Sequence, residues 1–381
     1  MADRIILRAG ALHDGFGGAP RHDRALVIED GCFVEEFDGA RAAALGGQLI
    51  EAEVVAPGFI DLQLNGAGGV LFNDAPLPES LRTMAEGARR GGTAYFLPTF
   101  ITDAGRKYQR AMEAVRAAAR QLPEVIGLHL EGPFLSPARP GIHPADCIRP
   151  MADEDLAHLT QFDLPLMLTL APEEAAPGQV AALARAGVRV FAGHSEGRFE
   201  DIAAAEDEGL SGATHLFNAM SQVAGRAPGV VGAVLDSGRL AAGIIADGQH
   251  VHPANLRLAL ARLGAGRLFL VTDAMSPLGT DVTEFDLLGK RIYRRDGRLS
   301  DANGVLAGAD LSMIEAVRQM DALTGCGLGA AIRMASLTPA EVMGLGDSLG
   351  SVTPGKRAGL TLMDAELQVT AVMVDGQMRP A

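Results

Sequence analysis

The hydrophobic pattern changes character twice along the chain. Residues 1–55 contain short apolar runs separated by turn residues, and Asp30-Gly31 between two of these runs is a strong β-hairpin signal. From about residue 56, apolar runs of strand length alternate with Ala-rich amphipathic segments of helical period. After residue 349 the pattern is β-like again. We therefore expect one small β domain, built from both chain ends, beside a central α/β region.

The central region contains eight apolar runs of strand length, and amphipathic segments such as 81–91 and 108–122 lie between them. The predicted strands are 59–64, 93–99, 125–131, 166–172, 188–194, 212–217, 241–247 and 267–273. Eight successive β/α units favour a (β/α)₈ TIM-like barrel. We assign residues 56–348 to this barrel, and residues 1–55 and 349–381 to a small β-sandwich domain.

After the eighth strand the pattern predicts an insertion and then helices. Residues 290–300 form a charged hairpin-like segment with Asp296-Gly297 at its tip. Helices are predicted around 310–323, 328–335 and 339–344.

Composition and charge narrow the class of partner. Of 381 residues, 48% are hydrophobic and 21% are charged, which is enough apolar material for a large core. Lys and Arg number 33 against 47 Asp and Glu, so the formal net charge is −14. Nucleic-acid binding relies on basic surfaces, so we do not expect a nucleic-acid partner. An anionic substrate would need a local cluster of positive groups.

The cysteines and the first residues point to the cytoplasm. Cys32, Cys147 and Cys326 are scattered and lack the spacing of metal ligands, as in a reducing compartment with free thiols. The first residues show charges at positions 3 and 4 and no sustained apolar segment, so we do not expect a signal peptide. No run of residues approaches the length of a membrane span, and we expect no membrane association.

Four predicted strands end on, or lead into, a side chain that suits metal or acid–base chemistry: Glu131, His194, His215 and Asp273. Taken singly, a histidine beside a glycine packs or caps, and an aspartate after a strand caps the next helix. A barrel, however, gathers the carboxyl ends of its strands at one face. One carboxylate and two imidazoles there suit a divalent metal with an open position, and a further carboxylate suits proton transfer. The sequence thus predicts a metallohydrolase.

His129 lies two residues before Glu131, so both side chains face the same side of their strand. It could serve as a further ligand. The simpler expectation is a histidine of the barrel interior that holds Glu131 or a substrate group.

Several segments carry a family resemblance. They are APGFIDLQLNGAGGVLFND (56–74), HLEGPFL (129–135), PGIHP (140–144), GHS (193–195), THLFNAM (214–220), ADGQH (246–250), VTDAM (271–275) and GVLAGA (304–309). In these segments, and over nearly its whole length, the chain resembles the N-acetylglucosamine-6-phosphate deacetylases of the amidohydrolase superfamily. One difference from most of that superfamily concerns its His-x-His pair, in place of which this chain has Gln63 and Asn65. Neutral amides are poor zinc ligands, so we expect one metal ion and expect these amides to hydrogen-bond the water at the metal.

The resemblance implies an activity and a set of residues. It implies hydrolysis of the acetamide of N-acetylglucosamine 6-phosphate to glucosamine 6-phosphate and acetate, in amino-sugar catabolism or cell-wall sugar recycling. Glu131, His194 and His215 would bind one divalent metal, most simply Zn²⁺, while a metal-activated water attacks the amide with Asp273 as general base and then acid. His143 would stabilise the oxyanion. The implied substrate contacts are Gln63, Asn65, Ile142, His143, Asn218, Ala219, Arg226, His250, Leu306, Ala307 and Gly308. Arg226 would reach the site of a neighbouring subunit, which implies a homodimer.

Three alternatives stay open. The nearest is a deacetylase of a related sugar phosphate, such as N-acetylgalactosamine 6-phosphate. A cyclic amidase of the same fold would normally keep the His-x-His pair, which this chain lacks. A barrel that lost its chemistry and became a scaffold would not be expected to keep Glu131, His194, His215 and Asp273 together.

Overall fold

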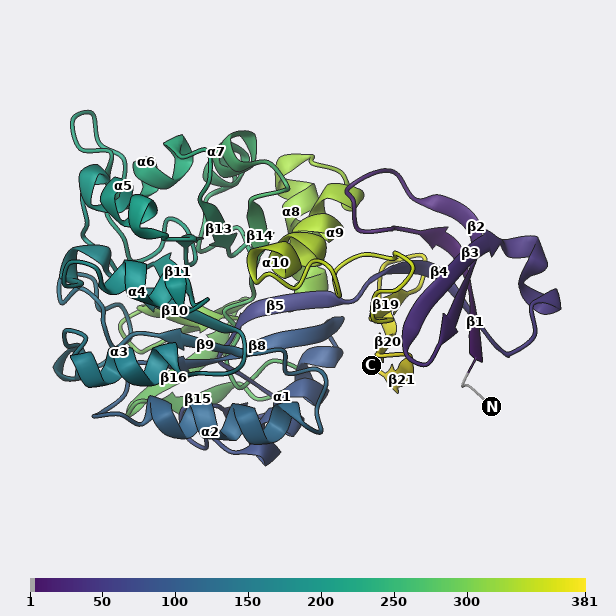
Figure 1. Ribbon diagram of the computed structural model, residues 1–381, viewed down its shortest axis with the longest axis horizontal. Helices are drawn as coiled ribbons and strands as arrows, with labels where there is room; N and C mark the ends of the chain where they lie inside the picture. Colours follow the sequence, from purple (N-terminus) through teal and green to yellow (C-terminus); the bar gives the residue numbers. More distant parts are fainter. Residues whose placement is uncertain (1–3) are drawn as a thin grey trace.

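The computed structural model describes residues 4–381 and contains a parallel β-barrel surrounded by helices, with a smaller sheet to one side (Figure 1). The barrel sheet has eight strands in the order β14-β13-β12-β11-β10-β9-β8-β5. These strands are β5 (Phe59–Leu64), β8 (Thr93–Ile101), β9 (Leu128–Glu131), β10 (Leu166–Leu170), β11 (Arg189–Ala192), β12 (Gly212–Ala213), β13 (Ala241–Ile244) and β14 (Leu268–Leu270). The predicted (β/α)₈ architecture is confirmed.

The barrel closes where the first strand meets the last. A parallel bridge joins Leu64 to Ala274, the amide of Asp273 donates to Gln63 O (3.0 Å), and the amide of Asn65 donates to Ala274 O (3.0 Å). Below this seam the buried carboxylate of Asp61 accepts the Thr272 hydroxyl at 2.5 Å. Burial raises the pKa of Asp61 to about 7. The seam therefore fixes the first and last strands relative to each other at Asp273, the candidate catalytic residue.

Several strands are shorter than the hydrophobic pattern predicts, and the reason is backbone geometry. We predicted strands ending on His194 and Asp273 and one passing through His215. In the structure these three residues have positive φ angles of 48°, 51° and 32°. A positive φ takes a non-glycine residue out of the extended ladder and costs conformational energy. The chain turns there and directs each side chain over the mouth of the barrel.

Helices pack around the barrel. They are α1 (Pro78–Arg89), α2 (Tyr108–Ala119), α3 (Asp153–Thr160), α4 (Gln179–Arg185), α5 (Phe199–Glu208), α6 (Gly229–Asp236), α7 (Pro253–Leu263), α8 (Met313–Thr324), α9 (Leu328–Ala335) and α10 (Leu337–Val342). The three helices predicted after the insertion correspond to α8, α9 and α10. Helix α8 begins at a capping box, in which the side chains of Ser312 and Glu315 each accept a hydrogen bond from the other residue's backbone amide.

Short elements interrupt the loops at the carboxyl face. After β5 lies a small hairpin of β6 (Gly66–Ala67) and β7 (Val70–Leu71). The insertion forms a four-stranded antiparallel sheet of β15 (Glu284–Leu287), β16 (Lys290–Arg295), β17 (Arg298–Ser300) and β18 (Leu306–Ala309). The predicted charged hairpin is the β16–β17 pair, and Asp296-Gly297 forms its turn. The 3₁₀ helices are η2 (Ala145–Cys147) and η3 (Pro172–Glu174), and η1 (Gly39–Ala44), which lies between β3 and β4 of the smaller sheet.

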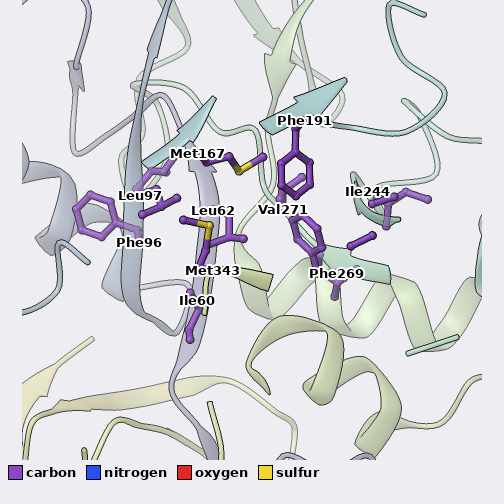
Figure 2. Close-up of a cluster of buried hydrophobic side chains, with 14 of the residues drawn as sticks. Ile60, Leu62, Phe96, Leu97, Met167, Phe191, Ile244, Phe269, Val271 and Met343 are labelled. Carbon is purple, nitrogen blue, oxygen red and sulfur yellow. The ribbon is translucent and has the colours of Figure 1, made fainter. Parts of the chain in front are cut away.

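The main core fills the barrel and the layer beneath the helices. Figure 2 shows Leu62, Phe96, Phe191 and Phe269 gathered from different strands, with Met343 entering from beyond α10. Phe191 and Phe269 meet edge to face, with ring centroids 6.0 Å apart. This apolar filling is a rigid base below the polar residues at the strand ends.

The smaller sheet combines both chain ends, as predicted. Its order is β21-β20-β19-β4-β1-β2-β3, and Figure 1 shows β1, the first described strand, and β21, the last, in this sheet beside the barrel. The strands are β1 (Arg4–Leu12), β2 (Arg21–Glu29), β3 (Cys32–Asp38), β4 (Gln48–Pro57), β19 (Leu360–Met363), β20 (Val369–Val374) and β21 (Gln377–Pro380). The Phe33 amide donates to Lys356 O at 2.9 Å, so β3 at the sheet edge also contacts the segment leading into β19, and the sheet curls around its own core. The domain limits at 55/56 and 348/349 remain our proposal.

Two further observations concern the described residues. The three cysteines are unpaired. None of the helices within residues 4–381 combines the length and apolar character that crossing a membrane requires.

Candidate metal centre and active site

Three predicted ligands converge at the carboxyl ends of β9, β11 and β12. The ligand atoms of Glu131, His194 and His215 all lie within 4.8 Å of one another, and all three residues are buried. Glu131 Oε1 is 3.2 Å from His194 Nε2 and 2.9 Å from His215 Nε2. The two Nε2 atoms are themselves only 3.2 Å apart. Two imidazole nitrogens and a carboxylate oxygen around a common point are a zinc-type donor set.

The charges of these groups favour a cation between them. Burial by itself would raise the pKa of Glu131, but hydrogen bonds from His194 and His215 hold that pKa well below its ordinary value. Burial opposes protonation of His215, yet the hydrogen bond to Glu131 raises the pKa of this imidazole. The carboxylate therefore stays ionised, and it draws positive charge to the point where the nitrogens meet.

His194 has the tautomer that a metal ligand needs. Its Nδ1 lies 2.9 Å from the carbonyl oxygen of Arg139, which can only accept, so Nδ1 carries the proton. In the neutral imidazole Nε2 then carries the lone pair that a metal ion would take, whereas a hydrogen bond from Nε2 to Glu131 requires a proton on that nitrogen. The loop after His194 is held by Glu173, which accepts the Ser195 hydroxyl at 2.6 Å.

Asp273 lies beside this cluster, and two side-chain amides bind one of its oxygens. Asn65 Nδ2 donates to Asp273 Oδ1 at 2.7 Å, and Gln63 Nε2 donates to the same oxygen at 3.1 Å. Burial and then the negative charge of Glu131 raise the pKa of Asp273 to about 6. A carboxylate with one oxygen bound and a pKa near neutrality suits proton transfer in both directions.

His143 packs directly on the candidate ligands. Its ring centroid is 4.3 Å from that of His194, and its Nδ1 is 2.8 Å from the Thr102 hydroxyl. Burial and the neighbouring His194 lower the pKa of His143 to about 3, so this imidazole is neutral. With Nδ1 engaged by Thr102, Nε2 is the nitrogen left for a substrate atom.

His129 is not a member of the ligand cluster. Its two ring nitrogens lie 3.0 Å from the Thr99 hydroxyl and 2.8 Å from the Thr169 hydroxyl. Complete burial lowers its pKa to about 4. The expectation of an interior histidine holds, although its partners are threonines rather than Glu131 itself.

A cavity of about 490 Å³ opens beside the cluster. Its walls include these predicted substrate and catalytic residues: Asn65, Ile142, His143, Asn218, Ala219, His250, Asp273, Leu306 and Gly308. Gly308 has φ +65° and a Cβ there would lie 2.7 Å from Asp273 O, so this turn needs glycine. Gln63 and Ala307 are buried and do not line the cavity, and Arg226 is exposed on a loop and does not line the cavity of its own chain either.

The far side of the cavity carries polar groups with defined partners. His250 Nδ1 is 2.6 Å from Asp247, whose other oxygen accepts the backbone amides of Gln249 and His250 at 2.8 Å each. The backbone amide of Asn218 already donates to His215 O (3.0 Å), whereas no acceptor within residues 4–381 takes the amide of Ala219. Of the two amides predicted for phosphate binding, that of Ala219 is the freer donor.

Sequence reasoning missed three residues that support this site. Thr102 binds His143, the Arg139 carbonyl orients His194, and Asp247 orients His250. Thr102 follows the last residue of β8, so its place at a strand end was an available signal. Asp247 lies within the ADGQH segment. A backbone carbonyl such as that of Arg139 leaves no trace in a sequence.

A family model, curated relatives and a solved structure all relate this chain to amidohydrolases. The sequence model of the amidohydrolase family matches residues 54–379. An N-acetylgalactosamine-6-phosphate deacetylase of Shewanella sp. is 42% identical over 87% of this chain and 84% of its own length. An N-acetylglucosamine-6-phosphate deacetylase of Haemophilus influenzae is 38% identical over 89% of this chain and 94% of its own length. The crystal structure of the Pasteurella multocida enzyme of that second name superposes with a TM-score of 0.94 at 35% identity, covering 99% of this chain and 100% of the other.

Proposed function

This chain belongs to the amidohydrolase family, and from that membership we propose that it hydrolyses the acetamide of N-acetylglucosamine 6-phosphate. The products are glucosamine 6-phosphate and acetate, and the setting is amino-sugar catabolism or cell-wall sugar recycling. One observation carries the proposal: Glu131, His194 and His215 converge within 4.8 Å, and Asp273 lines the same cavity. The Haemophilus influenzae and Pasteurella multocida proteins named for this activity support the choice of substrate.

We propose that Glu131, His194 and His215 hold one divalent cation, and that the cation is Zn²⁺. The residues fit such an ion because the Nε2 atoms are 3.2 Å apart beside an ionised carboxylate, and the Arg139 carbonyl fixes the His194 tautomer. Two imidazoles and one carboxylate are a common zinc donor set. A bound Zn²⁺ would supply a water of lowered pKa and polarise the acetamide carbonyl.

Asp273 moves the proton in this mechanism. Its Oδ1 is occupied by Asn65 and Gln63, so Oδ2 is left to take a proton from the attacking water. The raised pKa, about 6, lets the carboxylate hold that proton and then deliver it to the departing amine. Without that delivery the amine would leave as an anion, and cleavage of the C–N bond would stall.

His143 stabilises the negative charge that develops on the acetamide oxygen. A neutral imidazole can donate from Nε2 if Nδ1 accepts the Thr102 hydroxyl, and those two atoms are 2.8 Å apart. That hydroxyl has the Glu131 carbonyl as a second acceptor at 3.3 Å, so this tautomer requires its proton to point to His143 instead. The His143 ring packs against that of His194 at a 58° tilt, which places this donor beside the proposed ligands.

The phosphate and sugar occupy the rest of the cavity. We propose that Asn218, Ala219 and His250 bind the phosphate end, and that Ile142, Leu306, Ala307 and Gly308 contact the sugar directly or shape its loop. Asp247 supports His250 as a donor because it accepts the Nδ1 proton. Arg226 is exposed and does not line its own cavity, which supports a homodimer in which it reaches the partner's site.

A second candidate substrate is N-acetylgalactosamine 6-phosphate, because the 42%-identical Shewanella protein is named for that activity. Acetate release should be measured on both sugar phosphates and on unphosphorylated N-acetylglucosamine. The proposed function predicts the highest kcat/KM for N-acetylglucosamine 6-phosphate. A higher value for the galactosamine epimer would establish the second candidate instead.

We propose a cytoplasmic location for the enzyme. The three unpaired cysteines support a reducing compartment.

A further inference from the structure

Directly below the candidate metal ligands, a hydrogen-bonded row of side chains crosses the barrel. Thr99 Oγ1 lies 3.0 Å from His129 Nδ1, and His129 Nε2 lies 2.8 Å from Thr169 Oγ1. Thr169 Oγ1 in turn lies 2.6 Å from Thr214 Oγ1. We call these four residues, Thr99, His129, Thr169 and Thr214, the hydroxyl–imidazole layer.

The layer is buried, and its hydrogen bonds can all be satisfied with uncharged groups. Thr99, His129 and Thr169 have no exposed surface, and Thr214 is 1% exposed. A neutral imidazole has one donor and one acceptor, and each hydroxyl has one proton, so a single directional chain can run through all four residues. Breaking it would leave buried polar atoms without partners, which is costly in a protein interior.

Each candidate ligand lies next to a member of this layer. Glu131 follows His129 by two residues on β9 and pairs in register with Thr169 on β10. His215 directly follows Thr214. His194 directly follows Gly193, and a Cβ on Gly193 would lie 2.6 Å from Thr169 Cγ2 and 3.1 Å from the Thr214 Cβ. Glycine at 193 therefore lets the strand of His194 pack against the threonine pair.

This geometry ties together the strands that carry the ligands. Ladder bonds fix neighbouring strands, but each ligand itself lies at or beyond a strand end, and two of them have positive φ angles. The hydroxyl–imidazole layer lies directly beneath all three ligands and links the strands that carry them through side-chain hydrogen bonds. Apolar side chains of the same shape would fill this space, but their contacts are not directional. They would therefore not fix the position of each strand along the barrel axis relative to its neighbours.

We propose that the hydroxyl–imidazole layer sets the spacing of Glu131, His194 and His215, and so the affinity of the metal site, with Thr169 as its central positioning residue. The proposal rests on the proposed metal site. Groups that orient metal ligands from behind commonly contribute about ten- to a hundredfold in metal affinity. Thr169 does not line the cavity, and its hydroxyl bonds His129 and Thr214 rather than a ligand, so its effect on the ligands passes through the strands.

The test compares Thr169→Val, which removes the hydroxyl at nearly constant volume, with Thr169→Ser, which retains it. Thr361→Val is the matched control: Thr361 is also fully buried, donates to Gly92 O at 2.7 Å and accepts from the Phe59 amide at 3.3 Å, at the opposite end of β5. The Zn²⁺ dissociation constant is measured by competition with a chromophoric chelator. Melting temperature, and kcat and KM at saturating Zn²⁺, are measured on the same proteins.

We expect Thr169→Val to raise the Zn²⁺ dissociation constant about ten- to a hundredfold and Thr169→Ser to restore it to within a few fold. Thr361→Val should lower the melting temperature and leave the dissociation constant unchanged. If Thr169→Val fails to fold, Thr99→Val, which removes only the outer bond of the layer, is expected to weaken Zn²⁺ binding in the same direction.

An unchanged Zn²⁺ affinity in the folded Thr169 or Thr99 variants would overturn the proposal, as would an equal loss in Thr361→Val. These outcomes are separate from failure of the proposed function. A wild-type protein that binds Zn²⁺ but releases no acetate would contradict the deacetylase activity, while the affinities of the variants would still decide the role of the layer.

Discussion

The side-chain amide of Asn65 donates a 2.7 Å hydrogen bond to the carboxylate of Asp273. Asn65 stands at one of the two positions where most amidohydrolases are expected to carry a metal-binding histidine. Here its side-chain nitrogen donates to the carboxylate oxygen Oδ1 of Asp273, and the side-chain nitrogen of Gln63 donates to the same oxygen at 3.1 Å. These amides therefore orient Asp273, the proposed general base, and leave its other oxygen free, which is consistent with a centre built around one ion.

Replacing Asn65 by aspartate tests this relationship. Asn65→Asp places a second carboxylate where a donor stood, and like charges disfavour ionisation. We expect the pKa of Asp273 to rise and kcat at pH 7 to fall about tenfold, with partial recovery at higher pH. The measurement is the pH profile of kcat beside that of Asn65→Ala, which removes the donor without adding charge. An acid limb at the same pH in wild type and Asn65→Asp would contradict the assignment.

Asp273→Asn removes the proton carrier and keeps the shape of the side chain. We expect kcat to fall about 10²- to 10⁴-fold, because the amide can neither take the proton of the water nor return it to the amine. Metal content should stay at one ion per chain, since the three ligands are intact. Elemental analysis and acetate release on the same preparation check both points. Substantial turnover in this variant would exclude Asp273 as the acid–base group.

The pH dependence of the wild-type enzyme follows from the same carboxylate. In the proposed mechanism the ionised form of Asp273 is the base, so activity should be present above its pKa and lost as the pH falls through that pKa. Burial and Glu131 raise that pKa to about 6. A bound cation favours the ionised form, so the midpoint of the acid limb should lie at or below about pH 6. Metal content is followed at each pH to separate this limb from loss of the ion. A kcat that increases as the pH is lowered from 7 to 5 would be inconsistent with this role.

Arg226 provides a test of the dimer. Arg226→Ala should raise KM for the sugar phosphate about tenfold or more and change kcat little, because it removes binding remote from the reacting carbonyl. Hydrolysis of unphosphorylated N-acetylglucosamine should be unaffected.

The same residue allows a complementation experiment. Mixed dimers of Arg226→Ala and Asp273→Asn contain one site with both an intact Asp273 and an intact arginine from the partner, if Arg226 acts across the interface. Co-expression should then recover low-KM activity that neither variant shows alone. Absence of recovery in verified mixed dimers would place Arg226 in its own site or outside any site.

Asp155 anchors the segment that leads away from the loop of Ile142 and His143. Its fully buried carboxylate accepts from Arg149 at 2.6 Å and from Tyr108 at 2.7 Å. Burial opposes its ionisation, but these hydrogen bonds hold the pKa of Asp155 well below its ordinary value. A lowered folded-state pKa gives stability that is present above about pH 4 and lost as the pH falls further.

Asp155→Asn should therefore lower the free energy of unfolding by about 3 kcal/mol at pH 7, as expected for a broken buried ion pair. The carboxylate stays ionised in the folded state until the pH approaches its lowered folded pKa, so the difference from wild type should shrink between about pH 4 and pH 2. Urea unfolding at pH 7 and at about pH 2 measures both quantities. Equal differences at these two pH values would show that the charge of Asp155 does not contribute.

The sequence was sufficient to predict much of the barrel. The hydrophobic runs located every barrel strand, and β5 matches its predicted range of 59–64. Glu131, His194, His215 and Asp273 were identified because a parallel barrel brings strand ends together. The strand ends themselves were not predicted, since the positive φ angles of His194, His215 and Asp273 depend on tertiary contacts at the barrel mouth.

The supporting residues were harder to find, for a physical reason. Thr102, Thr169 and Thr214 lie in or beside apolar strands, where threonine is common and fits by shape alone. Only the partners across the barrel show that the Thr102 hydroxyl bonds His143, that of Thr169 bonds His129, and that of Thr214 bonds Thr169. Arg226 was predicted from the family resemblance alone. It is exposed in the single chain, and the complementation experiment tests whether it acts in the site of a neighbouring subunit.

The central claim is that one cation, held by Glu131, His194 and His215, supports deacetylation. The most direct measurement is titration of metal-free enzyme with Zn²⁺ while acetate release from N-acetylglucosamine 6-phosphate is followed. We predict that activity rises in proportion to added Zn²⁺ and levels off at one ion per chain, with glucosamine 6-phosphate formed in equal amount to acetate. No acetate release at any Zn²⁺ concentration, or activity that requires two ions per chain, would contradict the claim.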